Sequence, residues 1–188
     1  MNLDQIIPWE RYGFIAELVN RLENVSPQLG KTALQKLVYL LQEIFGVDAG
    51  YDFKLYTYGP FTSQLLQDLD QVDALHGVNV ELVESALGGY NISSGEKYRE
   101  IRDRAKDYLN EKKVKGGIDK LITEFGHLWA KELELRATIV YAVKNNKDLY
   151  EQDDLVNMIH EIKPRFNKVF IGQVINELKA KNYITLKQ

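Results

Sequence analysis

The sequence of 188 residues contains no cysteine, and this absence removes several classes of protein from consideration. Disulfide frameworks, thiolate zinc sites, iron–sulfur clusters and cysteine nucleophiles all require cysteine side chains. Histidine is scarce as well, with three residues at positions 76, 127 and 160. None of them has a second histidine three or four positions away, the spacing that places two metal ligands on one helix face. The sequence therefore predicts no metal site.

Long apolar runs are also missing. A membrane-spanning helix needs about 20 consecutive apolar residues, and the most apolar helical segment, 34–45, is interrupted by Lys36, Gln42 and Glu43. The first residues include Asp4 and Glu10, whereas a secretory signal needs an uncharged segment. We therefore expect a cytoplasmic, prokaryotic protein without a membrane partner.

Positive charge is absent from one long stretch, because no Lys or Arg occurs from Leu55 to Glu96. The net charge of the whole chain is −3, but residues 1–93 sum to −7 and residues 94–188 sum to +4. The near-neutral total thus conceals an acidic N-terminal half and a basic C-terminal half. This difference bears directly on the choice of partner.

The N-terminal half, 1–93, has the element order of a winged-helix-like module. Apolar residues recur every three or four positions in its helical segments and alternate in its extended segments. The pattern predicts helix, helix, strand, helix and hairpin at residues 8–22, 32–45, 51–58, 62–75 and 78–92. Gly59 and Pro60 are expected to end the strand. Any other small α+β domain with a hairpin shares this order, so that alternative stays open.

The C-terminal half, 94–188, is predicted to be helical. A charged helix at 95–111 and a linker at 112–117 precede helices at 118–129, 135–143, 153–162 and 168–181, with a final strand at 183–186. This order is compatible with a second winged-helix-like unit. The predicted fold is therefore α+β and mostly α, with the N-terminal module packed on the helical C-terminal half in a shared core.

No motif for catalysis or phosphate binding is present. The pairs Gly88-Gly89 and Ser94-Gly95 lack the spacing of phosphate-binding loops, and no nucleophile elbow occurs. Asp70 and Asp73 can share a helix face as cation ligands do, but a solvated acidic face is the simpler interpretation. We therefore expect no catalytic residue, no cofactor and no metal, with an enzyme of unrecognised type as a remaining alternative.

Charge favours a protein over a nucleic acid as the partner of the N-terminal module. A winged helix that binds DNA places its third helix in the major groove and its hairpin near phosphates, and these contacts need Lys or Arg. The corresponding stretch of this chain has neither residue and is acidic. The predicted protein-binding residues are Tyr56, Tyr58, Phe61, Asp68, Asp70 and Asp73.

The basic C-terminal helix supports the alternative of a DNA-binding, transcription-regulator-like protein. Its predicted nucleic-acid contacts are Arg165, Lys168, Gln173, Lys179 and Lys181. Such a regulator is expected to be a homodimer, because paired half-sites need two copies. Lysines near a helix C-terminus can instead offset the helix dipole without binding anything.

Two segments, KTALQKLVYLLQEIFG (31–46) and FKLYTYGPFTSQLLQDLDQV (53–72), resemble the YwgA-like proteins and, more distantly, the Panacea domain of SocA-type antitoxins. The similarity covers about residues 30–80 and is carried by Leu34-Gln35-Lys36-Leu37 and Tyr58-Gly59-Pro60. The resemblance implies a Panacea-like core and a non-enzymatic prokaryotic protein, antitoxin-like or regulatory. For an antitoxin, the protein partner bound through the acidic module is a toxin.

Overall fold

The computed structural model describes residues 7–84, 88–146 and 151–186. The helices within these ranges are α1 (Trp9–Leu22), α2 (Lys31–Phe45), α3 (Ser63–Ala74), α4 (Tyr98–Arg104), α5 (Lys106–Asn110), α6 (Lys112–Phe125), α7 (Ala130–Asn145), α8 (Gln152–Ile162) and α9 (Lys168–Ala180). The strands form two antiparallel hairpins, β1 (Lys54–Tyr56) with β2 (Gly59–Phe61) and β3 (Val78–Leu82) with β4 (Tyr90–Ser94). The predicted class, α+β and mostly helical, is confirmed.

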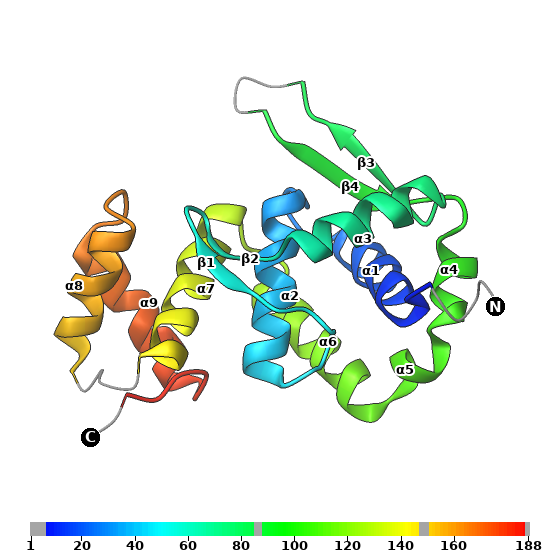
Figure 1. Ribbon diagram of the computed structural model, residues 1–188. Coiled ribbons are helices and arrows are strands. Elements are labelled where there is room, and N and C mark those ends of the chain that lie inside the picture. Colours follow the sequence, from blue (N-terminus) through cyan, green and yellow to red (C-terminus); the bar gives the residue numbers. More distant parts are fainter. Residues whose placement is uncertain (1–6, 85–87, 147–150, 187–188) are drawn as a thin grey trace.

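Helix α2 is central because apolar residues surround most of its circumference. Every residue from Ala33 to Leu41 is buried. Helices α6 and α7 pack against α2, while α1 packs against α3 and α4, as Figure 1 shows. One continuous hydrophobic core contains residues of both halves of the chain. The division at residue 93 stays a prediction, and the core does not stop there.

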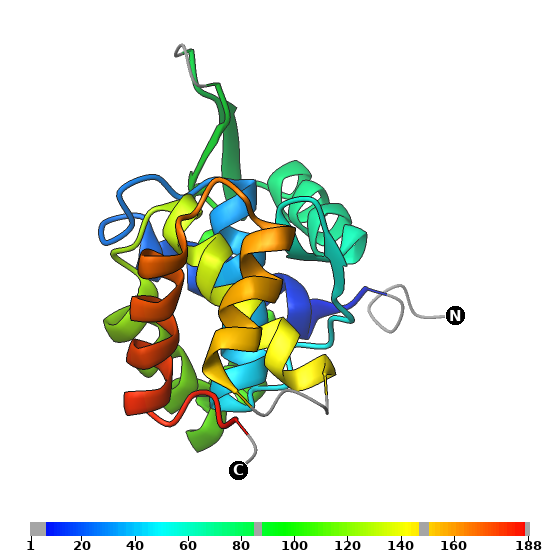
Figure 2. The same ribbon diagram turned by 90° about the vertical axis from the view of Figure 1, so that its left-hand side faces the viewer.

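The β3–β4 hairpin projects from the helical body (Figures 1 and 2). Its base is anchored by Val78 and Ile92, which are buried, and by the backbone N–H of Ile92, which donates to the Leu29 carbonyl at 2.8 Å. Farther out, the side chain of Leu82 is 68% exposed. The predicted hairpin is confirmed, and its outer part presents side chains to solvent.

The predicted strand at 51–58 is wrong in its extent. Strand β1 covers only Lys54–Tyr56, and the chain then reverses so that Tyr56 pairs with Gly59. Gly59 adopts a φ of 87°, a backbone conformation that residues other than glycine rarely adopt. Gly59 and Pro60 therefore begin the returning strand β2, whereas the sequence pattern indicated the end of a strand.

Two predictions for the middle of the chain are also wrong. The helix expected at 95–111 is divided into α4 and α5 at Ala105, whose methyl group packs against Gly13 of α1. The segment expected to be a linker, 112–117, is the first part of α6. Gly117 is needed there because a Cβ would lie 2.3 Å from Val47 Cγ2. Gly117 therefore allows α6 to pack closely against Val47.

The last helices follow the prediction closely. Asn167 caps α9 by accepting a hydrogen bond from the Phe170 N–H at 2.8 Å. Helices α8 and α9 lie beside α7 at one end of the molecule (Figure 1). The strand expected at 183–186 does not form. This segment instead packs through Ile184, which is buried, and through Tyr183, whose ring lies 5.6 Å from that of Phe45.

Candidate protein-interaction site

Two polar side chains on the buried face of α2 hold the β1–β2 hairpin. Gln35 donates to the Thr62 carbonyl at 2.7 Å and accepts from the Thr62 N–H at 3.0 Å. Lys36 donates from Nζ to the Pro60 carbonyl at 2.7 Å. These bonds satisfy backbone groups that would otherwise be buried without partners. The hairpin is therefore tied to the central helix by side-chain contacts.

The hairpin also presses against α7. A Cβ at Gly59 would lie 2.9 Å from Thr138 Oγ1, so no larger residue fits without a shift. Thr138 itself is buried and donates to the Glu134 carbonyl at 2.7 Å. Gly59, which follows the turn Thr57–Tyr58, therefore lies between α2 and α7.

Next to this turn lies a buried cluster of charges. Glu134 of α7 is 3% exposed and accepts a hydrogen bond from Arg165. Lys163 Nζ forms an ion pair with Glu134 Oε1 at 2.8 Å. Lys163 also donates to the Thr57 carbonyl. One carboxylate thus faces two cations, and the loop between α8 and α9 reaches the hairpin turn.

Lys36 adds a further positive charge to this region. It is 2% exposed and pairs with no carboxylate within 4 Å in the described part of the chain. Burial lowers the pKa of Lys36 from 10.5 to about 8, with Glu134 acting in the opposite direction and Lys163 in the same direction. Cationic groups therefore outnumber carboxylates in this buried cluster.

A cavity of about 290 Å³ opens beside the hairpin. Its walls are Lys31, Thr32, Gln35, Lys36, Tyr56, Thr57, Tyr58, Gly59, Phe61 and Leu66. Tyr56 and Tyr58 are each 61% exposed, and the Tyr56 ring lies 5.4 Å from the ring of Phe61. The three aromatic residues predicted to bind a protein are thus brought together at one cavity, which we call the hairpin cavity.

A second cavity, of about 270 Å³, also borders the first turn of α2. We call it the Trp129 cavity, because Trp129 is 56% exposed in its wall. Tyr90 of β4 also contributes, and Lys31 Nζ lies 4.4 Å from the centre of the Tyr90 ring. Lys31 and Thr32 line both cavities, so the two form one surface across the start of α2.

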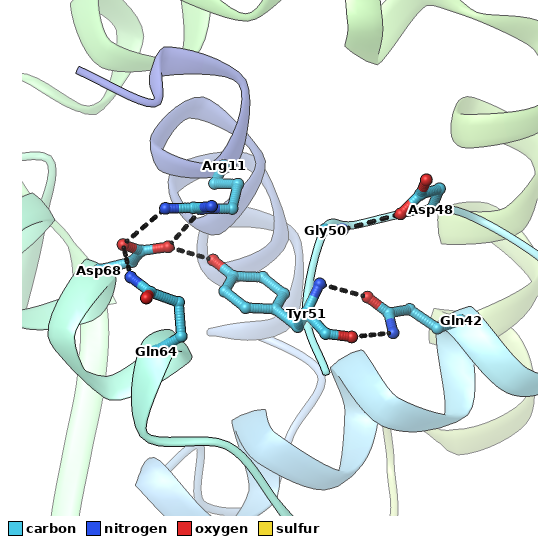
Figure 3. A network of polar contacts seen from close by, with 7 residues as sticks. All are labelled: Arg11, Gln42, Asp48, Gly50, Tyr51, Gln64 and Asp68. Atoms are coloured by element: carbon cyan, nitrogen blue, oxygen red, sulfur yellow. Dashed lines mark hydrogen bonds and ion pairs between the residues drawn. The ribbon is translucent and has the colours of Figure 1, made fainter. Parts of the chain in front are cut away.

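Asp68 does not belong to this surface, although the sequence placed it in the protein-binding set. It is 2% exposed and lies at the centre of the network in Figure 3. Arg11 Nε donates to it at 2.7 Å, Tyr51 OH at 2.9 Å and Gln64 Nε2 at 3.0 Å. Burial and the neighbouring Asp68 both raise the pKa of Tyr51. Asp68 therefore holds α1, α3 and the segment before β1 together.

The other two aspartates of α3 differ from each other. Asp70 has a side chain that is 63% exposed and lies 3.5 Å from Lys31 Nζ, so it remains at the edge of the hairpin cavity. Asp73 accepts a hydrogen bond from the Val80 N–H at 3.0 Å and thus ties α3 to the middle of β3. Only Asp70 keeps the solvent-facing position expected of all three.

The basic residues predicted to contact DNA are engaged within the fold. Arg165 pairs with Glu134 and Lys181 with Glu124. Lys168 donates to Asn157 at 2.7 Å, and Lys179 donates to Gln152 at 3.0 Å. Gln173 lines a shallow groove between α8 and α9 together with Lys168 and Asp153. Every cation of this set therefore has an internal partner, and a carboxylate lies in the groove.

Within the described ranges no group of three or more histidine, aspartate or glutamate side chains could hold a metal ion. His160 Nδ1 lies 2.9 Å from the Phe166 carbonyl oxygen, which gives this histidine a structural contact. No helix in the same ranges is long and apolar enough to cross a membrane.

Several residues of the site were missed by sequence reasoning. In the sequence Lys36 interrupts an apolar segment, but the apolar residues on every side of the helix indicate that Lys36 is itself buried. Glu134, Lys163 and Trp129 come from distant segments, and no local pattern reveals that they converge on the α2–hairpin region.

Comparisons with known proteins do not identify the chain: no protein-family model and no curated protein sequence matches it. The similarity of about residues 30–80 to the YwgA-like proteins and the Panacea domain therefore stays a prediction.

Proposed function

We propose that this chain is a non-enzymatic, antitoxin-like or regulatory protein that binds a protein partner at the hairpin cavity. The observation that supports it best is the pair of tyrosines, Tyr56 and Tyr58, each 61% exposed at the rim of an apolar-walled cavity. Tyrosine is enriched among residues that dominate binding energy at protein interfaces. Its ring supplies contact area at a small cost in conformational entropy.

The support of the hairpin fits this role. Partners that bind a preorganised surface lose less free energy to ordering than partners that bind a mobile one. Contacts from Gln35, Lys36 and Lys163 hold both sides of the Tyr58 turn. The exposed tyrosines are therefore presented on a rigid base rather than on a free loop.

The proposal includes a winged-helix-like topology for the N-terminal half and a cytoplasmic location. Helices α1 to α3 followed by the projecting β3–β4 hairpin keep the winged-helix order, while β1 and β2 form a separate sheet. The DNA-binding alternative has weaker support, because two of its four cations, Arg165 and Lys181, are paired with carboxylates of the chain itself. A homodimer is expected only under that alternative.

The proposal is tested by co-expression with the product of the neighbouring gene. We expect wild-type protein to form a stable complex with that product and to relieve any toxicity it causes. The double variant Tyr56→Ala, Tyr58→Ala should lose both effects, whereas Tyr98→Ala on α4, which packs against α1, should retain them. A complex that survives the double variant, or no complex with wild type, contradicts the proposal.

A further inference from the structure

We propose that the partner presents an extended acidic segment to this chain, with one apolar anchor in the hairpin cavity, a second in the Trp129 cavity, and a carboxylate between them at the first turn of α2. This inference rests on the proposed function and specifies the chemistry of the partner.

The first support is the continuity of the two cavities. Their volumes are about 290 and 270 Å³, and both are lined by Lys31 and Thr32. Exposed aromatic rings stand at either end, with Tyr56 and Tyr58 on one side and Tyr90 and Trp129 on the other. A single chain crossing the start of α2 can therefore place an apolar side chain in each cavity.

The second support is the state of the α2 N-terminus. Its N-cap is Gly30, which has no side chain to accept a hydrogen bond, and its first turn contains no acidic residue. The N–H groups of Lys31, Thr32 and Ala33 donate to no acceptor among the described residues. Such a terminus carries partial positive charge and favours a carboxylate.

The third support comes from the cations around this terminus. Lys31 Nζ has one carboxylate nearby, the exposed Asp70 at 3.5 Å. Lys36, almost completely buried in the wall of the hairpin cavity, has no carboxylate within 4 Å in the described part of the chain, interacts with Glu134 only at longer range, and donates to the Pro60 carbonyl. A partner carboxylate would offset this local excess of positive charge. A basic segment would be repelled by it, so charge complementarity selects the acidic occupant.

Defined peptides test the proposal by NMR titration of the full-length protein. The probe is N-acetyl-Phe-Gly-Glu-Gly-Phe-amide, and its uncharged isostere carries Gln in place of Glu. We expect the Glu peptide to shift the amide resonances of Lys31, Thr32 and Ala33 and to bind at least about tenfold more tightly than the Gln peptide, the ratio for one charge-assisted hydrogen bond. Phenylacetate, which has one ring and a free carboxylate, should bind more weakly than the Glu peptide.

A substitution at an exposed position provides the control. Thr32 is exposed at the second position of α2, and Thr32→Asp supplies a carboxylate to the free N–H groups from within the chain. This variant should have a higher thermal unfolding midpoint and should no longer distinguish the Glu peptide from the Gln peptide. Thr32→Asn, which adds no charge, should keep most of the preference.

Several results would overturn the inference. Equal affinity of the two peptides would show that no carboxylate is recognised at the first turn of α2. Tighter binding of phenylacetate than of the Glu peptide would indicate a small-molecule site. Absence of binding by every probe would show that the two cavities do not form a docking surface. If Tyr58→Ala abolishes the complex with the protein partner while the peptides bind equally, this inference fails and the proposed function stands. If the double tyrosine variant leaves the complex intact, the proposed function fails whatever the peptides do.

Discussion

The buried ammonium of Lys36 makes a quantitative prediction about stability and pH. Its pKa falls from 10.5 to about 8 on folding, chiefly because burial disfavours the charged form. Between these two values the unfolded chain binds more protons than the folded chain, so stability must rise as the pH rises. A fall of about 2.5 in the pKa of Lys36 lowers the free energy of unfolding at neutral pH by roughly 3 kcal/mol. About 2 kcal/mol of this loss is recovered between about pH 7 and about pH 9.5.

The measurement is the free energy of unfolding in urea for wild type and Lys36→Met across that range. The groups facing Lys36 are Glu134 on α7 and Lys163 in the α8–α9 loop, and both remain in the variant. Across this pH range only wild type should gain the additional stability of about 2 kcal/mol that comes from Lys36. Lys31→Met, on the same helix, should retain the wild-type slope. Identical slopes for wild type and Lys36→Met would refute the assignment of a depressed pKa to Lys36.

Other contacts lead to further expectations. Asp68→Asn should destabilise the fold by about 2–4 kcal/mol in urea denaturation, because the hydrogen bonds that Arg11, Tyr51 and Gln64 donate to the buried carboxylate lose its negative charge. Asp70→Asn on the same helix should change stability by less than about 0.5 kcal/mol. Equal effects of the two substitutions would contradict the network of Figure 3. Gly59→Ala should lower the thermal midpoint by more than Gly88→Ala, since both have positive φ but only Gly59 meets a neighbour, Thr138 Oγ1 at 2.9 Å. A larger loss for Gly88→Ala would contradict the tight contact between the hairpin and α7.

Helix positions were the most predictable part of the fold, because apolar spacing reports directly which face is buried. The apolar stripe of α1, the central position of α2 and the Asn167 cap of α9 all follow from local sequence and agree with the structure. The β3–β4 hairpin was equally clear from alternation and turn glycines. These features depend on interactions between residues close together in the sequence.

The errors arose where a distant contact decides the local conformation. Glycines at 116 and 117 indicated a linker, but Gly117 provides the clearance that α6 needs beside Val47. Gly59 and Pro60 indicated the end of a strand, but Lys36 and Thr138 hold them as the return of a hairpin. The partners of these residues lie far along the chain, so no local pattern identifies them.

The candidate site, too, could be predicted from local sequence only in part. Tyr56, Tyr58 and Phe61 were selected from the sequence, and the structure places them at one cavity. Asp68 was selected from the same helical region, yet its burial depends on Arg11, which lies 57 residues earlier. Trp129 and Tyr90 meet near Lys31 only because α7 and β4 both pack by the start of α2.

The affinity of the purified protein partner for wild type and for Tyr58→Ala tests the central claim most directly. Truncation of a tyrosine at the centre of an interface costs about 2 kcal/mol, so titration calorimetry should show a Kd that is roughly 30-fold weaker for Tyr58→Ala. The Tyr98→Ala protein should bind as wild type does. A Kd for Tyr58→Ala within about twofold of the wild-type value would contradict the claim that the hairpin cavity is the binding site.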